Sequence, residues 1–249
     1  MSFTERFADR ANDYVAGRPS YPAAALDALF DGLGDARDVV AADLGAGTGI
    51  SSRLLAERGA HVFAVEPNQP MREAAEAHAR VEWIAATAES TGLDEASIDL
   101  VTAFQAFHWF DRAKALREIV RILRPAGRAA AIYNERDESD PFTAAYGDLV
   151  RAYQTDETER RRADALEAFA AFEGWHTRRR VEVRNEHPLD AEGVLARTRS
   201  SSYLPKSGPN ADELHAAVRA LFAQHAQQGR IVMAMRTIVV TGDVGADGG

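Results

Sequence analysis

The 249-residue sequence predicts an α/β fold in three layers, with a largely parallel sheet between two layers of helices. Two observations support this prediction. Up to about residue 134, short apolar runs typical of buried strands alternate with stretches of helical periodicity. The first apolar run also ends in the glycine-rich turn "DLGAGTG". Such a strand-to-helix turn is typical of the sheet edge at which open α/β sheets bind ligands.

The elements are expected in a definite order along the chain. A helical segment fills the start, and Pro22 stands in an early helical turn, where proline is tolerated. In the first half, strands are predicted at 39–44, 61–66, 81–86, 97–107 and 129–134, and helices at 51–59, 69–79 and 112–123. In the second half, helices are predicted at 141–153, 155–172, from about 190, and at 212–228, and strands at 178–189 and 231–242.

Neither an internal repeat nor a domain linker interrupts this order. We therefore expect one domain over residues 1–249, with a frayed tail at its end. Its expected parts are an N-terminal helical lid (1–36), a ligand-binding core (37–134), lid insertions around a late strand (135–230) and a last strand (231–242).

Composition and charge narrow the class of protein. The sequence is 46% hydrophobic, which supports a sizeable core, and it has no cysteine, which excludes thiolate nucleophiles and cysteine metal sites. The net charge of -9 makes a nucleic-acid partner a poor expectation, and the histidines show no metal-ligand spacing.

The sequence has neither a membrane-length apolar run nor a signal peptide. We therefore expect a cytoplasmic protein with a small-molecule partner, and a homodimer stays open. The arginine runs 160–162 and 178–180 are interpreted as solvated faces.

The glycines of the first turn favour one kind of ligand over another. Dinucleotide turns prefer the spacing G-x-G-x-x-G, but Gly45, Gly47 and Gly49 are two residues apart, and Ile50 stands where that pattern wants glycine. Asp43 precedes the turn, and a carboxylate there suits a cationic ligand better than a pyrophosphate. A turn without a ligand is the alternative, although such a turn rarely needs three glycines.

Acidic residues follow the second and third predicted strands. Glu66 lies about twenty residues beyond the turn, where a carboxylate can accept hydrogen bonds from both hydroxyls of a ribose. Glu89, or the backbone around Thr87 and Ala88, could meet an adenine ring. The alternatives are a surface glutamate before a turn at Glu66 and a solvated side chain at Glu89.

Three stretches together resemble the class I S-adenosylmethionine-dependent methyltransferases: "DLGAGTG", "VEPN" and "LRPAGR". The resemblance covers residues 39–134 and implies a Rossmann-like, seven-stranded sheet with an antiparallel last strand. It also implies S-adenosyl-L-methionine as cofactor. Family members often have an aspartate where Thr87 stands. The cofactor-binding residues that the resemblance implies are Asp43, Gly45, Ala46, Gly47, Glu66, Pro67, Thr87, Ala88, Glu89 and Gln105.

A narrower resemblance lies outside the core. "YVAGRPSYP", "QAFHWFD", "RSSSYLP" and "MRTIVVTG" are similar to the small-molecule group that includes the trans-aconitate methyltransferases. In that group the N-terminal helix closes over the cofactor. By this analogy Tyr14 packs near the sulfonium and Arg18 pairs with the cofactor carboxylate. A core position for Tyr14 and a helix cap at Arg18 are the alternatives.

In this fold the end of the fourth strand points at the transferred methyl. His108 is the one titratable group of "QAFHWFD", so we expect it to face the substrate as a base or as an orienting group. A structural ring under Trp109 is the alternative. The candidate substrate-binding residues are Tyr21, His108, Trp109, Tyr133, Arg199, Tyr203 and Arg236. Arg199, Tyr203 and Arg236 are chosen because a carboxylate substrate would want such donors, and for each a packing or surface role stays open.

The predicted function is methyl transfer from S-adenosyl-L-methionine to a small molecule, at oxygen, nitrogen or carbon. A carboxylate or a secondary metabolite is a candidate acceptor. Two other functions stay open. One is a cofactor-binding protein that assists a cyclisation or binds the cofactor as structure, without methyl transfer. The other is a nicotinamide-dependent oxidoreductase, against which the glycine spacing and Asp43 argue.

Overall fold

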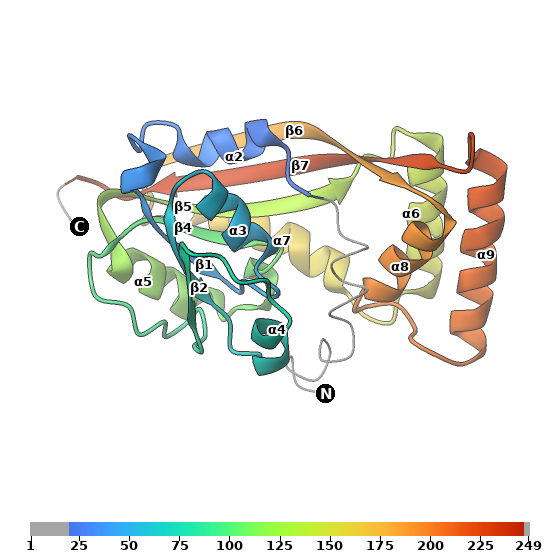
Figure 1. The fold of residues 1–249 in the computed structure, drawn as a ribbon, viewed down its shortest axis with the longest axis horizontal. Helices are drawn as coiled ribbons and strands as arrows, with labels where there is room; N and C mark the ends of the chain where they lie inside the picture. Colours follow the sequence, from blue (N-terminus) through green and yellow to red (C-terminus); the bar gives the residue numbers. More distant parts are fainter. Residues whose placement is uncertain (1–19, 247–249) are drawn as a thin grey trace.

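A computed structural model describes residues 20–246, which form one seven-stranded sheet with helices on both faces (Figure 1). The strands are β1 (Val40–Leu44), β2 (His61–Val65), β3 (Val81–Ile84), β4 (Ile98–Phe104), β5 (Leu123–Arg136), β6 (Thr177–Leu189) and β7 (Ile231–Asp243). They are ordered β3-β2-β1-β4-β5-β7-β6. β7 runs antiparallel to β5 and β6, and the other neighbours are parallel. This arrangement confirms the predicted α/β fold, with its seven strands and antiparallel last strand.

The helices divide between the two faces of the sheet and one of its ends. They are α2 (Ala23–Phe30), α3 (Ile50–Glu57), α4 (Gln69–Glu73), α5 (Arg112–Ile122), α6 (Pro141–Tyr153), α7 (Thr158–Ala171), α8 (Ala191–Ser200) and α9 (Pro209–His225). Leu29 of α2 and Leu55 of α3 belong to the buried core on one face. Leu116 of α5 and Phe169 of α7 belong to the core on the other. Strand residues alternate between these cores, which explains the nearly continuous apolar runs of the sequence.

A third cluster of buried side chains lies apart from both sheet cores. It joins α6, α8 and α9 to the adjoining ends of β6 and β7, through residues such as Val150, Leu195 and Leu214. In Figure 1 these three helices lie together at the right, next to the ends of β6 and β7. Helix α7 comes from the same late part of the sequence, but it covers the sheet itself.

The structure corrects several predicted boundaries. The helix expected over 69–79 ends at Glu73, because the N–H groups of Ala74 and Ala75 bond to Arg72 and tighten the last turn. The strand expected over 97–107 ends at Phe104, because the next residue turns into the left-handed region and a short 3-10 helix follows.

Three later elements also begin or end elsewhere than predicted. Helix α7 begins three residues later than expected, where Asp156 accepts bonds from the N–H and hydroxyl of Thr158. Helix α9 begins at Pro209 and ends at His225, because a tight turn with Gln228 in the left-handed region leads into β7. β5 includes the residues 124–128 that were expected as a turn.

Within the described part of the chain, no helix is both long enough and apolar enough to cross a bilayer.

Candidate functional site

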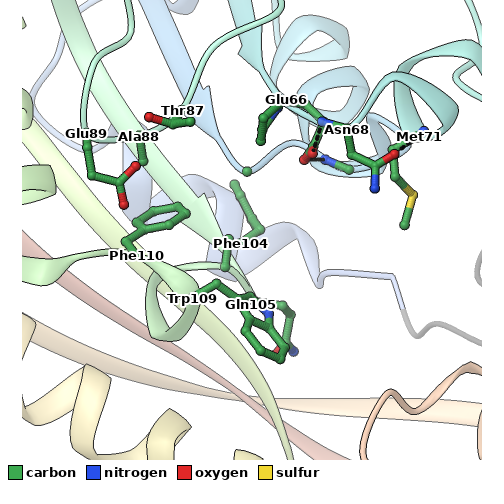
Figure 2. A pocket seen from close by; sticks show the side chains of 14 residues that line it. Glu66, Asn68, Met71, Thr87, Ala88, Glu89, Phe104, Gln105, Trp109 and Phe110 are labelled. Atoms are coloured by element: carbon green, nitrogen blue, oxygen red, sulfur yellow. Dashed lines mark hydrogen bonds between the residues drawn. The ribbon is translucent and has the colours of Figure 1, made fainter. Parts of the chain in front are cut away.

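A pocket with about 820 Å³ of empty space, part of it open to solvent, lies where β1, β2 and β4 end (Figure 2). Its lining comes from the segments that follow these strands and β3, as parallel strands predict. The lining residues are Gly45, Gly47, Glu66, Pro67, Asn68, Met71, Thr87, Ala88, Glu89, Phe104, Gln105, Ala106, Trp109 and Phe110. The lining thus includes eight of the predicted cofactor residues and Trp109; it does not include Asp43 or Ala46. Tyr14 and Arg18 lie outside the described residues.

The three glycines of the first turn all have positive φ, but they leave room for different neighbours. A Cβ on Gly45 would lie 2.7 Å from the Cβ of Ala106, and one on Gly49 would lie 2.8 Å from the ring of Trp83. A Cβ on Gly47, at φ +58°, would have no neighbour within 4 Å. Gly45 and Gly49 therefore permit close packing, whereas Gly47 presents bare backbone to the pocket.

The carboxylate of Asp43 is fully buried beneath this turn. Its Oδ2 accepts hydrogen bonds from the hydroxyls of Ser51 (2.6 Å) and Ser52 (2.7 Å), and its Oδ1 accepts one from Thr102 (2.9 Å). Burial raises the pKa of this carboxyl, although the three donors act in the opposite direction. Asp43 therefore joins the end of β1 to the start of α3 and to β4.

Glu66 places a buried carboxylate at the pocket edge of β2. One oxygen accepts a bond from the N–H of Gly47 and the other from the N–H of Asn68, both at 2.9 Å. Burial raises the pKa of Glu66, and the two N–H donors lower it. Only 3% of the residue is exposed, yet it lines the pocket and has further lone pairs to offer a ligand.

The turn after β3 is braced against helix α5. Thr87 and Ser90 form a bridge, and a carboxylate oxygen of Glu89 accepts a bond from the N–H of Asp111 at 2.8 Å. Asp111 caps α5. Glu89 therefore has a structural contact as well as a place in the pocket lining.

Gln105 follows β4 with φ +54°, a conformation that side-chain-bearing residues seldom adopt. Its N–H bonds to the carbonyl of Ile132 at 2.8 Å, and its Nε2 donates to the carbonyl of Asn134 at 3.2 Å. Figure 2 shows Gln105 beside Trp109 on one wall of the pocket.

His108 lies in the 3-10 helix η3 (Phe107–Trp109) and contacts the hydroxyl of Tyr133 twice. Its N–H donates to that oxygen at 3.0 Å, and its Nδ1 lies 3.1 Å from it. Tyr133 is fully buried, and burial raises the pKa of its hydroxyl. Which group donates in the second contact depends on the tautomer of the imidazole. The catalytic role of His108 stays a prediction.

Trp109 is in the pocket lining, whereas His108, Tyr133 and the remaining substrate candidates are not. The ring of Tyr21 packs edge-on against Phe104, a lining residue, with ring centroids 4.7 Å apart. Arg236 pairs with Glu182 at 3.4 Å on the outer strands.

Two further candidates lie in helix α8 and in the loop after it. Arg199 lies 3.8 Å from Glu192 on the same helix. The carbonyl of Tyr203 accepts bonds from the N–H and hydroxyl of Thr155, which ties the loop after α8 to the start of α7.

One residue next to the pocket was missed by the sequence interpretation. Arg162 was expected on a solvated face, but only 13% of its side chain is exposed. Its Nη2 donates to Oε1 of Gln105 and to the carbonyl of Asn134, both at 2.9 Å, and lies 2.8 Å from a carboxylate oxygen of Glu135. A signal was present, because Arg162 lies three, four and seven residues before the buried residues Ala165, Leu166 and Phe169.

Comparison with known proteins relates the chain to methyltransferases. Residues 42–131 match the family model described as "Methyltransferase domain". An uncharacterized methyltransferase of Mycobacterium tuberculosis is 41% identical over 146 residues, or 58% of each chain. An uncharacterized methyltransferase-like protein of Schizosaccharomyces pombe is 32% identical over 146 residues, or 58% of this chain and 57% of that protein. The match thus spans less than two thirds of these curated relatives.

Solved structures share the fold over more of the chain. The structure of a candidate type II methyltransferase of Anaeromyxobacter dehalogenans matches with a TM-score of 0.62 and 27% identity. The match covers 92% of this chain and 98% of that protein's chain. A candidate methyltransferase from an antibiotic biosynthesis pathway of Anabaena variabilis has a TM-score of 0.56 at 23% identity, covering 81% and 90%, and supports the fold alone. The matched domain, the curated relatives and the shared fold together support a methyltransferase.

Proposed function

We propose that this protein transfers a methyl group from S-adenosyl-L-methionine to a small molecule. The observation that carries the proposal is the pairing of Glu66 with Gly47. A buried carboxylate and an open stretch of glycine backbone lie side by side, joined by a 2.9 Å hydrogen bond, at the edge of the sheet. A carboxylate there suits the two hydroxyls of a ribose, and bare backbone lets the rest of a nucleoside approach closely.

The other lining residues fit the remaining parts of this cofactor. In this proposal Thr87, Ala88 and Glu89 border the adenine, while Phe104 and Trp109 provide apolar walls that exclude water. When bound, the cofactor supplies a methyl on a positively charged sulfur.

The residues of the protein then position the acceptor in line with that methyl and keep water away. His108 belongs to the proposal as a group that orients the acceptor. This role suits an acceptor that needs no base, for example a carboxylate. The resemblance to the trans-aconitate methyltransferase group makes small carboxylic acids the first acceptors to test.

Calorimetric titration with S-adenosylhomocysteine tests the binding half of the proposal. We expect the wild type to bind, and Gly47→Val to lose at least about tenfold in affinity, because the new side chain enters the pocket. Gly229→Val is the matched control: this glycine also has positive φ (+75°) and open space around its Cβ, but it lies outside the pocket lining. A wild type that does not bind, or a Gly47→Val variant that binds equally well, would refute the proposal.

The transfer half is tested by incubation with labelled cofactor and a library of metabolites. Formation of S-adenosylhomocysteine together with a product heavier by one methyl supports transfer. A protein that binds the cofactor but forms neither product with any acceptor would instead favour the alternative of binding without transfer.

A further inference from the structure

Arg162 links helix α7 to a wall of the pocket. It projects from α7, a helix of the late segment, and its Nη2 reaches the side chain of Gln105 behind that wall. The same nitrogen contacts the carbonyl of Asn134 and the carboxylate of Glu135 at the end of β5. The guanidinium also lies 5.6 Å from the ring centroid of Tyr133. One cation therefore touches the pocket wall and the strand beside it.

The partners of Gln105 explain why this contact matters. Its φ of +54° is unfavourable for a residue with a side chain, so surrounding contacts must hold the conformation. The amide oxygen accepts from Arg162, and the amide nitrogen donates to Asn134. With both ends engaged, the side chain has one orientation, and removal of Arg162 leaves the oxygen without its charged donor.

We propose that Arg162 is a positioning residue that fixes Gln105, and with it the pocket wall formed by residues 105–110. Its effect on cofactor affinity rests on the function proposed above, whereas its effect on the wall does not. Because Arg162 belongs to α7 and bonds to Gln105, a shift of this helix moves the pocket wall that faces the cofactor.

The neighbouring arginine provides a matched control on the same helix. The side chain of Arg160 is 73% exposed and pairs weakly with Glu157 and Asp164, at 3.6 and 3.9 Å. Arg160→Met removes the same charge from α7 without touching the pocket wall. Arg162→Lys is the conservative variant, because it keeps the charge but replaces the planar guanidinium with a compact ammonium group.

Hydrogen exchange of the ligand-free protein tests the structural claim. We expect Arg162→Met to accelerate exchange in the peptide covering residues 105–110, where the N–H groups of Gln105 and Trp109 are bonded, and Arg160→Met to leave it unchanged. Arg162→Lys should lie between these two. Unchanged exchange in Arg162→Met, with the protein folded, would overturn the proposal.

Affinity for S-adenosylhomocysteine tests the consequence for the ligand. We expect Arg162→Met to weaken binding about tenfold, as loss of a charge-assisted contact predicts, and Gln105→Ala to weaken it too. Since Arg162 acts through Gln105, adding Arg162→Met to Gln105→Ala should cause no further loss. Additive losses, or faster exchange with unchanged affinity, would refute the link to the ligand. If Arg162→Met shows the exchange effect but the wild type binds no S-adenosylhomocysteine, the proposed function is refuted and the structural claim stands.

Discussion

At the scale of single residues, Asp43 shows how a residue of the glycine turn can serve the structure. Its three hydroxyl donors come from two elements, α3 and β4, so the carboxylate connects the end of β1 to both and fixes the turn between β1 and α3. Burial raises its pKa in the folded protein. Between the ordinary pKa of an aspartate and this raised value, the folded state binds the proton more tightly than the unfolded state. Stability contributed by Asp43 is therefore lost as the pH rises through this window.

The variant Asp43→Asn tests this proton linkage. We expect the free energy of unfolding of the wild type to fall, relative to the variant, as the pH is raised from about 4, by about 1.4 kcal/mol for each unit of pKa shift. Urea unfolding at several pH values measures the difference. Asp94→Asn is the control, because Asp94 is exposed. A difference between wild type and Asp43→Asn that stays constant with pH would contradict the raised pKa.

At the scale of elements, the start of helix α6 joins the predicted lid, the cluster of α6, α8 and α9, to the sheet. Asp140 caps the helix, and one of its carboxylate oxygens accepts from the N–H and the hydroxyl of Thr143, both at 2.8 Å. The Thr143 oxygen in turn accepts from the N–H of Ala234 in β7 at 3.0 Å. One cap therefore satisfies the helix end and sets its distance from the last strand.

Asp140→Ala should lower the free energy of unfolding by about 1 kcal/mol, the usual cost of a lost cap. Asp148→Ala on the same helix is the control, because its side chain is 78% exposed and pairs only with Arg151 at the surface. Urea unfolding measures both variants. Equal losses in the two would show that the cap contributes nothing beyond a surface charge.

The elements also show what could be predicted from the sequence. The core strands were predicted because buried parallel strands are apolar along their whole length. The helix at 69–79 was predicted too long, because its alanines and glutamates favour a helix, whereas the N–H groups of Ala74 and Ala75 bond to Arg72 and tighten the last turn. The side to which Asp43 points depends on strand pairing, and the burial of Arg162 depends on which face α7 presents. Neither follows from local composition.

At the scale of the whole molecule, the described residues pack in three clusters, two against the sheet and one in the predicted lid. The lid cluster contains α6, α8 and α9 and meets the sheet at the ends of β6 and β7. Leu214 of α9 and Leu55 of α3 are both fully buried, but they lie in different clusters. We therefore expect the lid to open as a unit below the energy of global unfolding.

Leu214→Ala and Leu55→Ala form a matched pair for this expectation. Each should cost about 2–5 kcal/mol at its own site, because each removes the same apolar volume from a packed core. Native-state hydrogen exchange should become faster in α6, α8 and α9 for Leu214→Ala, with β1, β2 and β4 still protected. Leu55→Ala should instead lower protection throughout, because opening the sheet core also removes the strands on which the lid rests. If Leu214→Ala accelerated exchange equally in the lid and the central strands, the lid and the sheet would unfold as one cooperative unit.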